Sequence, residues 1–182
     1  MNAIDLLLKR SSDPLLTLPA PEDSALQKIL LAGMRVPDHG ALKPFHFTVV
    51  KQEGLKKLSD IFVSAANNMG ADQVKLAKTE KMPFRAPLII IVSTRYTEHE
   101  KVPKSEQMIT AGCSVHAMQM AAFTLGFGAM WRTGELSYNA DVKKALSIDL
   151  QDDLVGFLYI GTKAKQLPEK VSKFFDDRVS YL

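Results

Sequence analysis

Apolar residues recur along much of the chain at the three-to-four-residue spacing of an amphipathic helix. The longest such stretch, residues 105–125, carries apolar side chains on nearly every face, which is typical of a buried helix. It is also rich in small residues, and Gly126 gives it a natural end. The spacing predicts six helices, at about residues 2–10, 21–34, 55–67, 72–81, 105–125 and 138–146, with Asn2 as a cap of the first and Ser137 as the cap of the last.

Shorter runs have the β-branched and aromatic residues that are typical of strands. The run 88–92 is apolar throughout, which suits a strand covered on both faces. By contrast, the stretch 11–21 contains three prolines and predicts irregular structure. Strands expected at 45–50, 88–92, 128–133 and 154–160, set among six helices, indicate a central sheet in an α+β or α/β fold.

The composition favours one globular domain over residues 1–182, because 46% of the residues are hydrophobic and 24% are charged. The formal net charge of +3 comes from scattered basic residues, which argues against a nucleic-acid partner and gives weak support for a phosphate-bearing ligand. The single cysteine, Cys113, excludes an intrachain disulfide. No apolar stretch is long enough for a membrane span and the first residues lack a basic signal head, so we expect a cytoplasmic protein without a membrane partner.

The C-terminal residues 163–182 combine little regular pattern with large apolar side chains. Leaving such side chains in water is costly, and exposed apolar surface often marks an interface. The segment therefore predicts an arm that packs on a partner subunit, with a disordered terminus as the alternative. The apolar residues on which this prediction rests are Phe174, Phe175, Val179, Tyr181 and Leu182.

Two polar segments in the first half of the chain are candidates for ligand binding. Arg10, Ser11 and Ser12 could clamp a phosphate, although an arginine at a helix end also simply offsets the helix dipole. Arg35 and His39 lie in a short proline-stiffened segment that suits a polar ligand or, equally, a solvated surface loop.

The segment 126–134 carries the most informative chemistry. Its glycines permit tight backbone geometry, and the only tryptophan, Trp131, stands beside Arg132 and Thr133. These glycines could simply mark strand ends and bulges. An aromatic side chain, a cation, a hydroxyl and free backbone amides nevertheless match the needs of a flavin ring and its phosphate. The chain has no dinucleotide-binding glycine motif, phosphate-loop lysine motif, serine-hydrolase motif or metal-spaced cluster.

Taken in order, these segments resemble the nitroreductase family, over about residues 1–162. The resemblance rests on their order and spacing rather than on any one of them. The motifs that carry it are Arg10-Ser11-Ser12, Arg35-Val36-Pro37-Asp38-His39, Lys43-Pro44-Phe45-His46-Phe47, Phe84-Arg85-Ala86-Pro87, the long small-residue helix and Gly126-Phe127-Gly128-Ala129-Met130-Trp131-Arg132-Thr133-Gly134.

The resemblance implies an α+β fold, with a central, mostly antiparallel sheet of four to five strands flanked by helices, in an interlocked homodimer. It further implies FMN at the subunit interface, NADH or NADPH as electron donor, and ping-pong reduction of nitroaromatic, quinone or similar small acceptors. No catalytic side chain is assigned, because the cofactor carries the redox chemistry. The FMN contacts would come from Arg10, Ser11, Ser12, Trp131, Arg132 and Thr133, with Arg35 and His39 approaching from different subunits, and NAD(P)H would lie near Ala121, Ala122, Phe123, Thr124, Leu125 and Gly126.

The chain departs from the family pattern in two places. Ser11 stands where the family commonly has an arginine, and Lys43-Pro44-Phe45 stands where it usually has Gln-Pro-Trp. Lys43 leads to the hypothesis that a positive charge near the flavin stabilises its reduced form. The alternatives to the reductase are a flavin reductase and a non-catalytic flavin-binding or storage protein.

Overall fold

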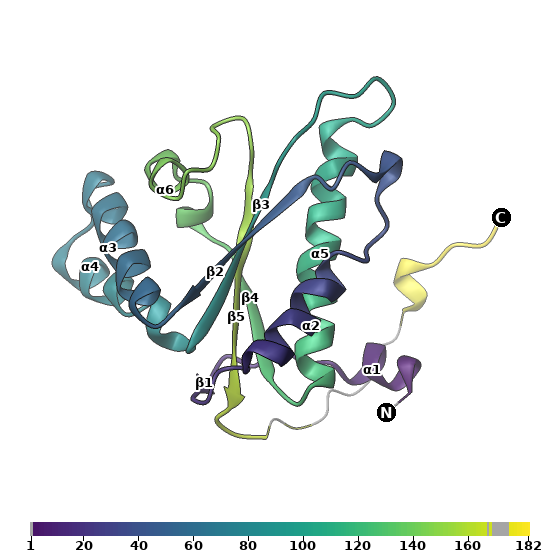
Figure 1. Cartoon of the computed structure of the whole chain (residues 1–182), viewed down its shortest axis with the longest axis horizontal. Coiled ribbons are helices and arrows are strands. Elements are labelled where there is room, and N and C mark those ends of the chain that lie inside the picture. Colours follow the sequence, from purple (N-terminus) through teal and green to yellow (C-terminus); the bar gives the residue numbers. More distant parts are fainter. Residues whose placement is uncertain (1, 167, 169–174) are drawn as a thin grey trace.

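A five-stranded antiparallel sheet separates two layers of helices in the computed structural model, which describes residues 2–166, 168 and 175–182. Strand β3 lies between β2 and β5, and β5 also pairs with β4 and with the short β1. Helices α2 and α5 cover one face of the sheet, with α1 against α5 on the same side, and α3, α4 and α6 lie on the other side (Figure 1). The strands are β1 (Leu16–Thr17), β2 (Phe45–Lys51), β3 (Leu88–Thr94), β4 (Gly128–Arg132) and β5 (Leu154–Lys163).

The helices fall close to their predicted positions. Together with the antiparallel sheet, they confirm the predicted α+β class. The long helix α5 runs for 21 residues and ends where Gly126 adopts a φ of 87°. The helices are α1 (Ala3–Lys9), α2 (Asp23–Gly33), α3 (Glu53–Asn68), α4 (Gln73–Glu80), α5 (Lys104–Thr124) and α6 (Ala140–Ala145), with single 3-10 turns at η1 (His39–Ala41), η2 (Pro83–Arg85), η3 (Glu135–Ser137) and η4 (Asp176–Arg178).

Alternate side chains of the central strands enter two separate cores. Ile90 of β3 is paired with Leu158 of β5, and both face α2 and α5. The next residues, Ile89 and Tyr159, face α3 on the opposite side. Every residue of β3 is buried, as expected for a strand that is covered on both faces.

Two local predictions were wrong. The stretch 11–21 is not wholly irregular, because Leu16 and Thr17 pair with the end of β5 as β1. The last helix begins at Ala140 rather than at Tyr138, and its cap is Asn139, whose side chain accepts a hydrogen bond from the Val142 N–H at 3.1 Å. Serine and asparagine are comparable caps, so sequence alone does not choose between positions 137 and 139.

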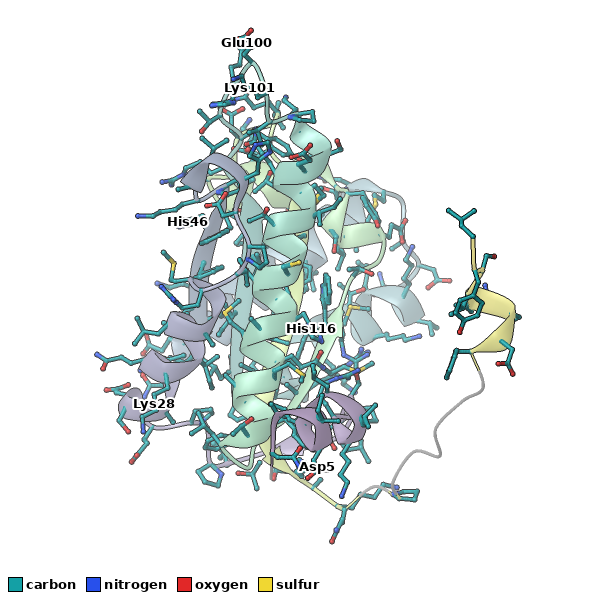
Figure 2. All side chains as sticks on the ribbon, turned by 90° about the vertical axis from the view of Figure 1, so that its right-hand side faces the viewer. Asp5, Lys28, His46, Glu100, Lys101 and His116 are labelled. Carbon is teal, nitrogen blue, oxygen red and sulfur yellow. The ribbon has the colours of Figure 1, made fainter. Side chains whose placement is uncertain are left out.

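Residues 175–182 of the C-terminal segment lie apart from both helical layers (Figure 1, Figure 2). Phe175, Tyr181 and Leu182 are exposed. Phe174 lies outside the described residues. The packing of this arm on a partner therefore stays a prediction. Within the described residues, no helix has the length and apolar character that crossing a membrane requires.

Candidate functional site

Trp131 sits at the end of β4 on the face of the sheet that α5 covers. Its indole Nε1 donates a hydrogen bond to the Val155 carbonyl at 3.2 Å. Gly156, whose φ is 148°, lies directly against the ring, and a Cβ atom on Gly112 of α5 would lie 3.8 Å from Trp131 Cη2. Two glycines thus leave room for the ring, and only Gly156 adopts a conformation that other residues rarely reach.

Arg10 and Ser12 lie beside the start of the same strand. Arg10 Nη1 donates to Ser12 Oγ at 3.3 Å, and the Asp13 N–H donates to the Ala129 carbonyl at 3.0 Å. Gln119 of α5 links the two elements, because its Nε2 donates to Ser12 Oγ and to the Ala129 carbonyl. The arginine and the serine are thereby held next to β4 and the C-terminal half of α5.

Gln119 was missed by the sequence reasoning. It is buried, and it bonds to both the predicted phosphate clamp and β4. A polar residue inside an apolar helix was the available signal, since a buried amide requires hydrogen-bond partners. Gln119 therefore joins the residues that position the candidate site.

Arg35 and His39 lie at the opposite end of α5. His39 Nδ1 is 2.8 Å from Glu106 Oε2, near the start of the helix, and Arg35 is exposed. Thirteen residues of α5 separate Glu106 from Gln119, which at about 1.5 Å per residue places them about 20 Å apart along the helix axis. Within one chain, the structure does not bring His39 together with the Arg10 segment.

Arg132 points to the face of the sheet opposite to Trp131, as adjacent residues of a strand do. Its guanidinium carbon lies 5.6 Å from the centre of the Tyr159 ring, in the second core. Burial, and then repulsion from Arg85, lower the pKa of Arg132, while burial raises the pKa of Tyr159 to about 12. Thr133 follows the strand and is exposed.

The segment 121–126, predicted to border the nicotinamide cofactor, is the C-terminal turn of α5 and its cap. The Phe127 N–H donates to the Ala122 carbonyl at 2.9 Å, which closes the helix end. Ala122 itself is fully buried in the first core, whereas Thr124, Leu125 and Gly126 are exposed. The exposed residues are the ones that a ligand could reach.

Among the residues that the structure describes, no helix covers the outer surface of α5 between its two ends (Figure 2). Figure 2 shows His116 on this surface, with α1 below it. Gly112 and Cys113 are half-buried there, and Ile109 is exposed. Small residues on a half-covered helix leave room for a flat ligand or another backbone. Among the described residues, no group of three acidic, histidine or cysteine side chains could hold a metal ion.

The Arg10 segment, β4 and the small-residue helix α5 lie side by side in this fold. The model of the nitroreductase family matches residues 9–162. The chain belongs to the nitroreductase family, which confirms the resemblance read from the sequence.

Two relatives are similar over nearly their whole length. "Putative NAD(P)H nitroreductase YdjA" of Escherichia coli K12 is 46% identical over 162 residues, covering 89% of this chain and 88% of YdjA. A Haemophilus influenzae Rd protein named "Putative NAD(P)H nitroreductase" is 36% identical over 185 residues, covering 100% of both chains.

Solved structures show the same fold. A nitroreductase-like family protein from Bacillus cereus superposes with a TM-score of 0.87 at 21% identity, covering 100% of this chain and 96% of its own. A nitroreductase with bound FMN from Bacteroides fragilis has a TM-score of 0.76 at 20% identity, and both chains are fully covered. At such identities the likeness establishes the fold.

Proposed function

We propose that this chain is a cytoplasmic, FMN-dependent oxidoreductase that takes hydride from NADH or NADPH and reduces a small acceptor such as a nitroaromatic or a quinone. The observation that carries the proposal is the placement of Arg10 and Ser12 beside β4, on the face where Trp131 meets α5. Family membership and the FMN bound by a relative of the same fold support it.

The residues present fit FMN at both ends of that cofactor. Arg10, Ser11 and Ser12 offer a cation and two hydroxyls to the phosphate end. The flavin ring would meet an apolar surface formed by the Trp131 side chain and the small residues of α5. The backbone after β4 would offer it hydrogen bonds. Bound FMN supplies the hydride chemistry, and the protein binds and orients it while excluding water.

The donor and the acceptor would enter over the same exposed flavin face in turn. The exposed end of α5 at Thr124, Leu125 and Gly126 is the proposed border of the nicotinamide site. Arg132 would contribute through its backbone, because its side chain lies on the other face of the sheet. No side chain of the protein needs to act as an acid or base in this scheme.

We further propose that the enzyme is a homodimer of single-domain chains, residues 1–182, with FMN at the interface. The supporting observation is that the His39 and Arg10 ends of α5 lie about 20 Å apart, so one chain cannot bring both residues to the same flavin. In a two-fold pair, Arg35 and His39 would both come from the partner subunit, rather than one from each subunit, and residues 163–182 would pack on the partner. Exposed apolar side chains on the same layer of helices support an interface there, namely Ile4, Leu7, Leu8, Leu31, Met34 and Ile109.

An anaerobic titration tests the proposed activity. The purified protein, loaded with FMN, is expected to show a flavin spectrum in a ratio of about one FMN per chain, and NADH or NADPH should bleach it. Failure to bind FMN would refute the proposal at its first step. Binding without bleaching would instead identify a storage protein, and bleaching with turnover only on free flavin would identify a flavin reductase.

A matched pair of variants tests the interface. Leu31 on α2 and Val74 on α4 are both apolar and 63% and 78% exposed, but they lie in opposite helical layers. Leu31→Glu should dissociate the dimer and lower FMN occupancy, because it buries a charge at the interface. Val74→Glu should do neither. Native mass spectrometry that finds only monomer in the unaltered protein would refute the dimer.

A further inference from the structure

A cavity of about 410 Å³ lies on the face of the sheet opposite to the proposed flavin site. Helices α3 and α4 form one wall, and β4, β5 and the η3 turn form the other. Its volume lies within the range of small-molecule sites. The apolar part of its lining comes from Phe62, Met69, Met82, Met130, Leu136 and Phe157.

Two guanidinium groups line this cavity without an acidic partner. Among the described residues, neither Arg85 nor Arg132 forms an ion pair, and the Arg132 Nε atom is buried without a hydrogen-bond partner. The one acid in the lining, Glu135, is already bound by Lys75 Nζ at 2.8 Å. The cavity is therefore apolar in its body and positive at one end.

The two arginines also repel each other. Repulsion from Arg85 adds to burial in lowering the pKa of Arg132, so the charged form of Arg132 is disfavoured where it stands. The contact with the Tyr159 ring engages the face of the guanidinium and leaves its in-plane donors available. An anion between the two side chains would offset the repulsion and satisfy the buried donor.

This cavity and the proposed flavin site lie mainly on opposite faces of the sheet, although Trp131, Arg132 and Thr133 also line the cavity. Trp131 packs in the first core with α5, whereas Phe62, Phe157 and Tyr159 belong to the second core. Arg10 and Ser12 are tied to Gln119 of α5 on the first side. A ligand of the cavity would thus bind beside FMN without displacing it.

We propose that this cavity binds a small organic anion with a flat apolar body, of the aromatic carboxylate class, and that Arg85 and Arg132 hold its carboxylate. Guanidinium groups match carboxylates in a paired hydrogen-bond geometry, and the aromatic and methionine side chains suit a flat ring. Because η2 precedes β3 and Arg132 ends β4, the ligand would connect two strands of the sheet on the side away from the flavin.

Calorimetric titration of the FMN-loaded protein with 2-naphthoate tests the proposal. We expect saturable binding, at least about tenfold weaker binding to Arg85→Gln, and similarly weaker binding of the neutral 2-naphthamide. Lys78→Gln is the matched control, because it removes one positive charge from exposed surface of α4 and should leave the affinity unchanged. Thermal unfolding of each variant verifies that it is folded.

Three results would overturn the proposal. They are no binding of 2-naphthoate at millimolar concentration, equal binding to the unaltered protein and to Arg85→Gln, or release of FMN as 2-naphthoate binds. The last result would place the anion in the flavin site. Each can occur in a protein that, before 2-naphthoate is added, binds FMN and is bleached by NAD(P)H, so the failure of this proposal is distinguishable from failure of the proposed function.

Discussion

A methyl group added at Gly156 should lower the stability of the fold strongly. Gly156 lies on β5 beneath Trp131, with a φ of 148°. A Cβ atom there would overlap Trp131 Nε1 and lie 2.8 Å from the Arg132 carbonyl oxygen. Gly156→Ala must therefore displace the indole ring, shift β4, or both.

The expected loss of stability combines three physical effects. Overpacking of a filled core costs about 1–3 kcal/mol, and holding a non-glycine residue at this backbone conformation costs about 1–3 kcal/mol more. Displacing the ring also removes the hydrogen bond from Trp131 to the Val155 carbonyl, worth about 1 kcal/mol. We expect a free energy of unfolding lowered by about 3 kcal/mol or more, or a Tm lowered by about 6–12 °C in a chain of this size.

Urea unfolding of the flavin-free protein measures this loss, and Trp131 is the only tryptophan, so its emission reports the same site. The emission of Gly156→Ala should shift to the red as the ring becomes more exposed. Gly112→Ala is the control, because its Cβ would lie 3.8 Å from Trp131 Cη2, an ordinary contact. It should be neutral or stabilise by up to about 1 kcal/mol, through helix propensity. A loss below about 1 kcal/mol for Gly156→Ala would refute the reasoning.

Three further predictions concern ligand affinity, pH and redox potential. Arg10→Ala should raise the Kd for FMN at least about tenfold, measured by flavin fluorescence, because a charge-assisted hydrogen bond to the phosphate is lost. Tyr96, whose hydroxyl donates to Asp153 at 2.8 Å, has a pKa raised to about 12, chiefly by burial, above its ordinary value of about 10. Its contribution to stability should be complete below about pH 10 and lost as the pH rises toward 12, so Tyr96→Phe should flatten that fall in urea unfolding. Lys43→Gln should lower the midpoint potential of bound FMN by about 10–30 mV in spectroelectrochemistry, if Lys43 stabilises the reduced form.

Each of these predictions has its own control. Lys57→Ala removes an exposed cation from α3 and should leave the Kd for FMN unchanged; an equal effect would show that Arg10 acts only through net charge. Tyr138 is exposed, so Tyr138→Phe should leave the alkaline fall as it is. Lys43→Arg keeps the charge and should keep the potential. An unchanged potential in Lys43→Gln would remove the hypothesis about that residue.

Hydrophobic patterning determined most of the fold because the cores are built from it. The apolar run at 88–92 predicted a strand covered on both faces, and β3 is buried along its whole length. The all-round apolar stretch at 105–125 likewise predicted α5 within a residue or so at each end. The short β1 was beyond this reasoning, because a two-residue strand has no period to detect and forms only by pairing with Lys163 and Thr162.

The candidate site was predicted as a set of residues, but their grouping required the tertiary structure. Local sequence gave Arg10, Trp131 and Arg132 as neighbours of a flavin, since each belongs to a recognisable motif. It could not show that the alternation of β4 directs the Trp131 and Arg132 side chains to opposite faces, because the face that each residue meets depends on how the sheet packs. Nor could it show that Gln119 holds Ser12 against β4 across 107 residues of chain.

The same distinction holds for the partner subunit and for the cavity. The sequence by itself determined the family and the α+β class, because these follow from order, spacing and periodicity along the chain. Only the tertiary structure decided that His39 and Arg10 lie at opposite ends of α5, and that Arg85 and Arg132 meet in one cavity. Such relations depend on contacts between residues far apart in the sequence, and no local pattern encodes the distance between them.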